Sequence, residues 1–349
     1  MLSDLRIELL KKVSETPGAP GFEQKIRKLV IQEITPYVDS VSVDNMGNVV
    51  AFRKGTTEKR LMLAAHMDEI GFIVSHIDDK GYIRFIPLGG FDPKKLTSQR
   101  VIIHGNKDVI GVMGSKPIHL MSEEERGKNL KITDYFIDTG MKRDDLINLV
   151  SVGDPVTRER ELIEMGECIN GKSLDNRISV FILIESMRQL KDKILPFDTY
   201  AVFTVQEEVG LRGAQVSALK IQPEIGIAID TTIAFDVPGS SPHEQVSKLG
   251  DGVAIKIMDS SVIADQRMVS FMKKTADAAS IKWQTELLPA GGTDTANLQK
   301  MVKGGAIAGA VSIPTRHIHS VIEMVHKDDV KQAILLLSEL IEKMDAFEY

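Results

Sequence analysis

The sequence contains only one cysteine, Cys168, among its 349 residues. A single cysteine excludes an intrachain disulfide and a cysteine-rich zinc site, and it gives no indication of an oxidising compartment. Cys168 lies shortly before the segment that contains Asp175. We therefore expect Cys168 to fill space near that segment rather than to act as a catalytic nucleophile.

Excess positive charge and long apolar segments are also lacking. The chain has 43 lysines and arginines against 49 aspartates and glutamates, which gives no electrostatic reason to expect nucleic acid or an anionic membrane as a partner. No segment is apolar over the ~18–20 residues that a membrane helix needs. The first residues are acidic and amphipathic and do not resemble a signal peptide, so the sequence predicts a cytoplasmic protein.

The overall composition is that of an ordinary globular protein, with 43% hydrophobic and 26% charged residues. Strand-like apolar runs alternate with helical patterns before residue 70 and after residue 165, whereas short β-prone runs replace the helical patterns in between. The sequence thus predicts an α/β fold in which helices flank a mixed, mostly parallel sheet. Residues 1–70 and 165–349 would form this domain, and residues 71–164 would form a small inserted β-rich domain or barrel.

Three of the apolar runs end at residues that can bind metals or transfer protons. Runs 60–65, 200–205 and 224–229 lead to His66 and Asp68, to Glu207 and Glu208, and to Asp230. Apolar runs without alternation suit strands that are buried on both faces of a parallel sheet, and ligands bind beyond the carboxyl ends of such strands. Adjacent glutamates on an ideal strand face opposite sides, but Val209-Gly210 at the strand exit can turn both toward one site.

Histidine and carboxylate ligands suit divalent metals, and two neighbouring ions need a carboxylate that bridges them. The candidates are His66, Asp175, Glu208, Asp230 and either His317 or His319. Asp175 precedes an apolar helix, so it is either an N-terminal cap or a bridging ligand. His317 and His319 are two residues apart, so in an extended segment both face the same side.

Five short motifs carry a family resemblance. They are Ala65-His66-Met67-Asp68-Glu69-Ile70-Gly71, Leu174-Asp175-Asn176-Arg177, Gln206-Glu207-Glu208-Val209-Gly210, Gly291-Gly292-Thr293-Asp294 and Arg316-His317-Ile318-His319-Ser320. Together and in this order they resemble the M42 metallo-aminopeptidases, which include glutamyl and deblocking aminopeptidases and the tetrahedral, or TET, peptidases. The resemblance covers essentially the whole chain, including an insert where the family carries a PDZ-like dimerisation domain.

The resemblance implies a zinc-peptidase-like catalytic domain with two divalent ions per subunit. His66 and Asp230 would hold one ion, and Glu208 and His319 would hold the other. Asp175 would bridge the two ions. The resemblance implies zinc or cobalt, with manganese as a further choice, since carboxylate-rich sites accept several metals.

The resemblance also implies the roles of Glu207 and Asp68. Glu207 would be the general base that activates a metal-bound water, and Asp68 would orient His66. The implied activity is the removal of N-terminal amino acids from peptides with a free N-terminus. The family usually has tyrosine at the position of His317, and His319 is taken as the ligand because it aligns with the family's histidine before a small residue. Self-association from dimers to a tetrahedral dodecamer is implied as well.

Three alternatives remain open at this point. A dinuclear deacylase or amidase that acts on non-peptide amides would use the same ligands. A glycosidase with Glu207 and another carboxylate as its acid and nucleophile would work without metal. A non-enzymatic assembly or binding protein would lack some of the ligands, but none of the proposed set is missing here. The sequence does not determine whether an acidic, neutral or basic N-terminal residue is preferred.

Overall fold

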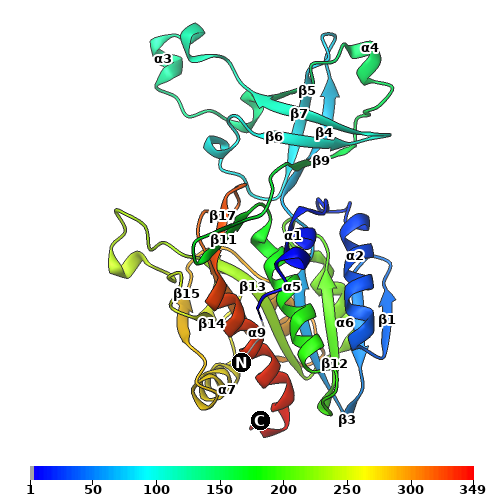
Figure 1. Cartoon of the computed structure of the whole chain (residues 1–349), viewed down its shortest axis with the longest axis vertical. Helices are drawn as coiled ribbons and strands as arrows, with labels where there is room; N and C mark the ends of the chain where they lie inside the picture. Colours follow the sequence, from blue (N-terminus) through cyan, green and yellow to red (C-terminus); the bar gives the residue numbers. More distant parts are fainter. Residues whose placement is uncertain (1–3) are drawn as a thin grey trace.

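A computed structural model describes residues 4–349 of the chain, which form an α/β part and a β-barrel at one end of it (Figure 1). The first helix, α1 (Ile7–Glu15), begins after Arg6. Ser3 precedes the apolar residues of this helix in the sequence and is a candidate N-cap by its residue type, but it lies outside the described residues. No helix within residues 4–349 is long and apolar enough to cross a membrane.

The α/β part is built on an eight-stranded sheet with the order β1-β2-β12-β3-β13-β16-β14-β15. Its strands are β1 (Ser40–Val43), β2 (Val49–Arg53), β3 (Gly55–His66), β12 (Leu195–Thr204), β13 (Ile225–Ile233), β14 (Val253–Met258), β15 (Trp283–Leu287) and β16 (Ile307–Thr315). The central strands β12, β3, β13 and β16 are parallel neighbours, as are β14 and β15, whereas the remaining pairs are antiparallel. The predicted mixed, mostly parallel sheet is therefore confirmed.

Helices cover both faces of this sheet. They are α1, α2 (Gln24–Ile34), α5 (Leu174–Gln189), α7 (Gln266–Ala278) and α9 (Lys327–Glu342) on one face, and α6 (Arg212–Ile221) and α8 (Thr295–Lys300) on the other. Along β3, Leu61 and Leu63 pack under the first group of helices, while Met62 and Ala64 pack under the second. This double burial explains why the apolar run before His66 shows no polar alternation.

The barrel is closed by six antiparallel strands in the order β4-β5-β8-β7-β6-β9. They are β4 (Gly71–Ile77), β5 (Ile83–Leu88), β6 (Arg100–His104), β7 (Asp108–Gly114), β8 (Phe136–Asp138) and β9 (Pro155–Arg158), with the short helices α3 (Glu123–Arg126) and α4 (Arg143–Leu146) in the connections. Phe72, Val101 and Ile137 belong to its own hydrophobic core. The predicted β-rich barrel is confirmed, while the domain boundaries at residues 70 and 165 stay a prediction.

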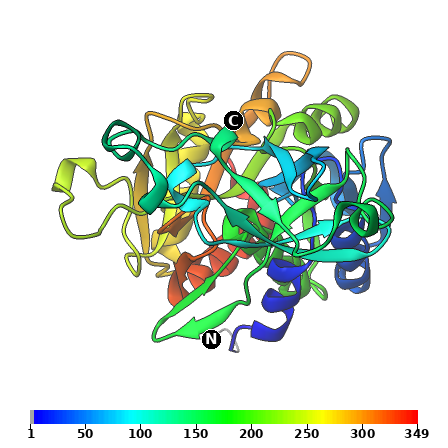
Figure 2. The same ribbon diagram turned by 90° about the horizontal axis from the view of Figure 1, so that it is seen from above.

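The barrel follows β3 directly, so it lies beyond the edge of the sheet to which β3, β12 and β13 point. Seen from above, its cyan and green strands lie in front of the central sheet (Figure 2). A small three-stranded sheet, β10 (Ile163–Met165), β11 (Cys168–Gly171) and β17 (Glu323–His326), connects back to the α/β part. Cys168 is half-buried there, opposite His326.

Candidate metal centre

His66 is the last residue of β3 and is 2% exposed. Its Nδ1 lies 3.2 Å from the main-chain oxygen of Asp68, and its Nε2 lies 3.4 Å from Oδ1 of Asp175 and 3.8 Å from Oδ1 of Asp230. A proton on Nδ1 that is donated to the Asp68 carbonyl leaves the Nε2 lone pair facing the carboxylates. This is the arrangement by which proteins orient a metal-binding imidazole.

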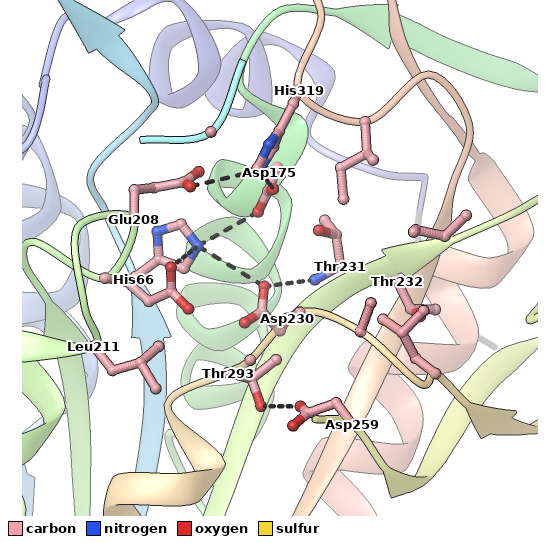
Figure 3. A pocket seen from close by; sticks show the side chains of 18 of the residues that line it. His66, Asp175, Glu208, Leu211, Asp230, Thr231, Thr232, Asp259, Thr293 and His319 are labelled. Carbon is pink, nitrogen blue, oxygen red and sulfur yellow. Dashed lines mark hydrogen bonds and ion pairs between the residues drawn. The ribbon is translucent and has the colours of Figure 1, made fainter. Parts of the chain in front are cut away.

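Asp175 lies between the two histidines at the irregular start of α5. Its two carboxylate oxygens face different rings, with Oδ1 3.4 Å from Nε2 of His66 and Oδ2 3.1 Å from Nε2 of His319 (Figure 3). Its backbone N–H donates to Oε2 of Glu323 at 2.9 Å. Asp175 and Asn176 both have non-helical backbone angles, so the regular helix begins after them. The carboxylate thus points at the histidines rather than capping the helix.

Glu207 and Glu208 lie in a turn after β12, which ends at Thr204. The strand geometry breaks at Gln206, whose φ of +53° lies in the left-handed region, so the break precedes both glutamates rather than following them at Val209-Gly210. Oδ1 and Oδ2 of buried Asp68 accept the backbone N–H groups of Glu207 and Glu208 at 3.0 and 3.2 Å. Asp68 therefore holds the glutamate turn as well as lying beside His66.

The segment with His317 and His319 is not extended, because both residues have φ values of +59°. Only His319 faces the other candidates, with Nε2 3.5 Å from Oε2 of Glu208. His317 is exposed, and partial desolvation together with the positive charges of Arg316 and Lys95 lowers its pKa. The expectation that both side chains face one side because of an extended backbone is wrong.

Asp230 lies within β13, which continues to Ile233 rather than ending at the apolar run. Its Oδ1 accepts the backbone N–H of Thr231 at 2.8 Å, and Figure 3 shows this carboxylate opposite His66. Donor atoms of His66, Glu207 and Asp230 lie within 4.8 Å of one another, as do those of His66, Asp175 and Glu208. The structure thus brings all five predicted ligands into one cluster together with Glu207, in which His319 is partly exposed.

The electrostatics of this cluster suit positively charged ligands. Burial raises the pKa of Glu207 well above its ordinary value, and it raises the pKa values of Glu208 and Asp230 to about 8. Burial alone would also raise the pKa of Asp175, but hydrogen bonds with His319 and His66 lower it. Oε1 of Glu208 is buried without a hydrogen-bond partner among residues 4–349. Divalent cations would fit this donor set, because they neutralise the carboxylates and occupy unpaired oxygens.

A second buried ion cluster, which the sequence did not reveal, holds the segment around Asp175. The carboxylate of Glu69 accepts from Nζ of Lys172 at 2.6 Å and from the hydroxyl of Ser173, and it lies 3.7 Å from Nη2 of Arg177. Lys172 and Arg177 flank Asp175, and all of these charges are buried. Adjacent residues of one motif therefore have separate tasks: Asp68 holds the glutamate turn, and Glu69 holds the Asp175 segment.

A cavity of about 440 Å³ opens from the cluster. Gly291, Gly292 and Thr293 line it, whereas Asp294 is not part of its lining and accepts the hydroxyl of Thr204 at 2.6 Å. The barrel contributes Gly90, which lies beside His319. The cavity continues past the candidate ligands toward Lys256 and Asp259 on the β14 side.

Comparison with known proteins places the chain among peptidases. Residues 47–336 match the M42 glutamyl aminopeptidase family. A relative from Acetivibrio thermocellus is 39% identical over 96% of this chain and 98% of its own. The lysyl aminopeptidase of Pyrococcus furiosus is 34% identical over 98% of both chains.

Solved structures agree with this match. A TET aminopeptidase from a marine sediment archaeon of the Thaumarchaeota has a TM-score of 0.94 and 37% identity, with 98% of each chain covered. The TET1 peptidase of Pyrococcus horikoshii, which can assemble into a tetrahedron or a large octahedral shell, has a TM-score of 0.87 and 32% identity, with 96% of this chain and 98% of its own covered. The chain therefore belongs to the M42 glutamyl aminopeptidase family and is a metal-dependent hydrolase of the aminopeptidase class.

Proposed function

We propose that this aminopeptidase holds two divalent ions and uses Glu207 as its general base. The observation that carries the proposal is the position of Asp175, whose two oxygens face Nε2 of His66 and Nε2 of His319. A carboxylate between two imidazoles is suited to bridge two cations. His66 and Asp230 would complete one site, and Glu208 and His319 would complete the other.

The two ions would be zinc or cobalt, with manganese as a further choice. When bound, such ions polarise the scissile carbonyl and acidify water. Glu207 would take a proton from the attacking water and return it to the leaving amine. Asp68 would keep Glu207 in place by accepting its backbone N–H. The free α-amino group of a peptide would be held near the metals and a carboxylate, which favours cleavage at the N-terminus.

The proposal includes the assembly and location of the enzyme. We infer that residues 1–70 and 165–349 form the catalytic domain and that the inserted domain, 71–164, mediates dimerisation. Dimers would then build a tetrahedral dodecamer, which is supported by the tetrahedral assembly of the P. horikoshii TET1 peptidase. The cytoplasmic location predicted from the sequence is kept as part of this proposal.

Removal of metal is expected to abolish activity. After exhaustive chelation and dialysis, hydrolysis of leucine p-nitroanilide should fall to background, and added zinc, cobalt or manganese should restore it because the ligand cluster is intact. The rate is measured against metal equivalents per chain, and two sites predict a plateau near two equivalents. Hydrolysis of the anilide that survives chelation would contradict the proposal. The glycosidase alternative predicts instead metal-independent cleavage of a glycoside and no cleavage of the anilide.

Acetylation of the substrate's α-amino group is expected to lower kcat/KM by about 10²-fold or more, because the acetylated nitrogen is uncharged and non-basic and is no longer held by the metals and a carboxylate of the site. The measurement compares leucine p-nitroanilide with N-acetyl-leucine p-nitroanilide on the same metal-loaded enzyme. Cleavage of the acetylated compounds alone would instead favour the deacylase or amidase alternative.

A further inference from the structure

On its β14 side the cavity meets a third buried charged cluster, which contains none of the candidate metal ligands. It consists of Lys256 on β14, Asp259 after β14 and Glu286 on β15, and we call it the end cluster. Nζ of Lys256 lies 3.1 Å from Oδ2 of Asp259 and 2.6 Å from Oε1 of Glu286. All three side chains are almost fully buried, and Lys256 and Asp259 line the cavity.

The end cluster contains one cation and two carboxylates. Burial alone would lower the pKa of Lys256, but the charges of Glu286 and Asp259 raise it, so the ammonium group stays protonated. Oδ2 of Asp259 also accepts the hydroxyl of Thr293 at 3.1 Å, as Figure 3 shows. Oε2 of Glu286 is buried without a hydrogen-bond partner among the described residues. The end cluster therefore carries a surplus of negative charge in spite of its lysine.

The ammonium group of Lys256 is already engaged by two carboxylates. A carboxylate from a substrate would be the third anion around this one cation, in a site that excludes much of the screening water. An ammonium or guanidinium group would instead be the second cation beside two anions. The lining of the cavity also includes Leu211, Leu288 and Ala290, whose apolar side chains suit the methylene stem of a long basic side chain.

We propose that the end cluster makes the enzyme prefer a basic N-terminal residue over an acidic one. This inference rests on the proposed aminopeptidase function, because it takes the cavity as the pocket for the first side chain of a peptide. Lys256 alone would suggest the opposite preference. The pairing with both Asp259 and Glu286 is what reverses it.

The first test compares aminoacyl p-nitroanilides on the metal-loaded wild-type enzyme. The expected kcat/KM for lysine p-nitroanilide exceeds that for glutamate p-nitroanilide by about tenfold or more. The leucine compound separates a failure of the proposed side-chain preference from a failure of the proposed aminopeptidase function. Turnover of leucine together with a preference for glutamate over lysine would overturn only the preference, whereas no turnover of any aminoacyl compound would overturn the proposed function and this inference together.

Two variants are expected to move the lysine-to-glutamate ratio of kcat/KM in opposite directions. Glu286→Gln removes one negative charge and should lower the ratio, whereas Lys256→Gln removes the cation and should raise it. Glu224→Gln is the matched control, because Glu224 lies before β13, at the opposite end of the sheet, and pairs with Arg60 at the surface. Its ratio should equal that of the wild type. An unchanged ratio in a folded Glu286→Gln variant would overturn the proposal. If that variant does not fold, the lysine-to-glutamate ratio of kcat/KM on the wild-type enzyme decides whether the proposed preference is right.

Discussion

Glu207→Gln is expected to lower kcat by about 10²–10⁴-fold while both ions stay bound. Glutamine keeps the size of the side chain but cannot take a proton from water. The backbone N–H of Glu207 would still donate to Asp68, so the turn would keep its shape. Metal content after dialysis, measured by elemental analysis, and kcat for leucine p-nitroanilide together check this expectation.

Glu208→Gln is the matched control, because the same chemical change is made one residue further along the same turn. Oε2 of Glu208 lies 3.5 Å from Nε2 of His319, so this variant should lose the ion that the two residues share. Oε2 of Glu207 also lies 3.8 Å from Nε2 of His66. Loss of metal from both variants would therefore mean that Glu207 is a ligand, and the division between a base and a ligand would be wrong.

The sheet could be predicted from the sequence because its signals are local. Residues 61–65 before His66 are all apolar, and this half of β3 is in fact buried on both faces, whereas most of the first half of the strand is exposed. The carboxyl ends of β3 and β12 lie side by side, with Thr204 opposite His66, as expected for parallel neighbours. Residues that follow such strands must meet at one edge, so the candidate ligands could be grouped without a structure.

The contacts that hold these candidates could not be predicted in the same way, because they join residues far apart in the sequence. Glu69 meets Lys172 and Arg177 only after the chain has passed through the whole barrel. Lys256 lies in an otherwise apolar strand, and its partners could not be identified from the sequence. A lone charge in such a run nevertheless indicates that the side chain has a buried partner of opposite charge. The φ values of +53° at Gln206 and +59° at His317 break the regular geometry on which sequence periodicity depends.

Asp68→Asn is expected to weaken metal binding and to lower kcat together. Both carboxylate oxygens of Asp68 accept backbone N–H groups, from Glu207 and Glu208, and Oδ1 also lies 3.4 Å from Nδ1 of His66. An amide places an NH₂ group against one of these donors, so one buried N–H loses its acceptor. The glutamate turn and His66 would then shift at once. Substitution of residues that orient metal ligands typically lowers metal affinity or activity by about 10–100-fold, so we expect losses of about this size in metal affinity and in kcat.

Asp329→Asn is the matched control for Asp68→Asn. The two oxygens of buried Asp329 accept the backbone N–H groups of Gly250 and Gly252 at 2.7 and 2.8 Å, so the same bonding pattern occurs away from the candidate ligands. Both variants should lower the free energy of unfolding by about 1–3 kcal/mol, because each leaves a buried N–H unpaired. Only Asp68→Asn should also weaken metal binding in a titration calorimeter. Equal metal affinity in the two variants would mean that Asp68 stabilises the fold without positioning the metal centre.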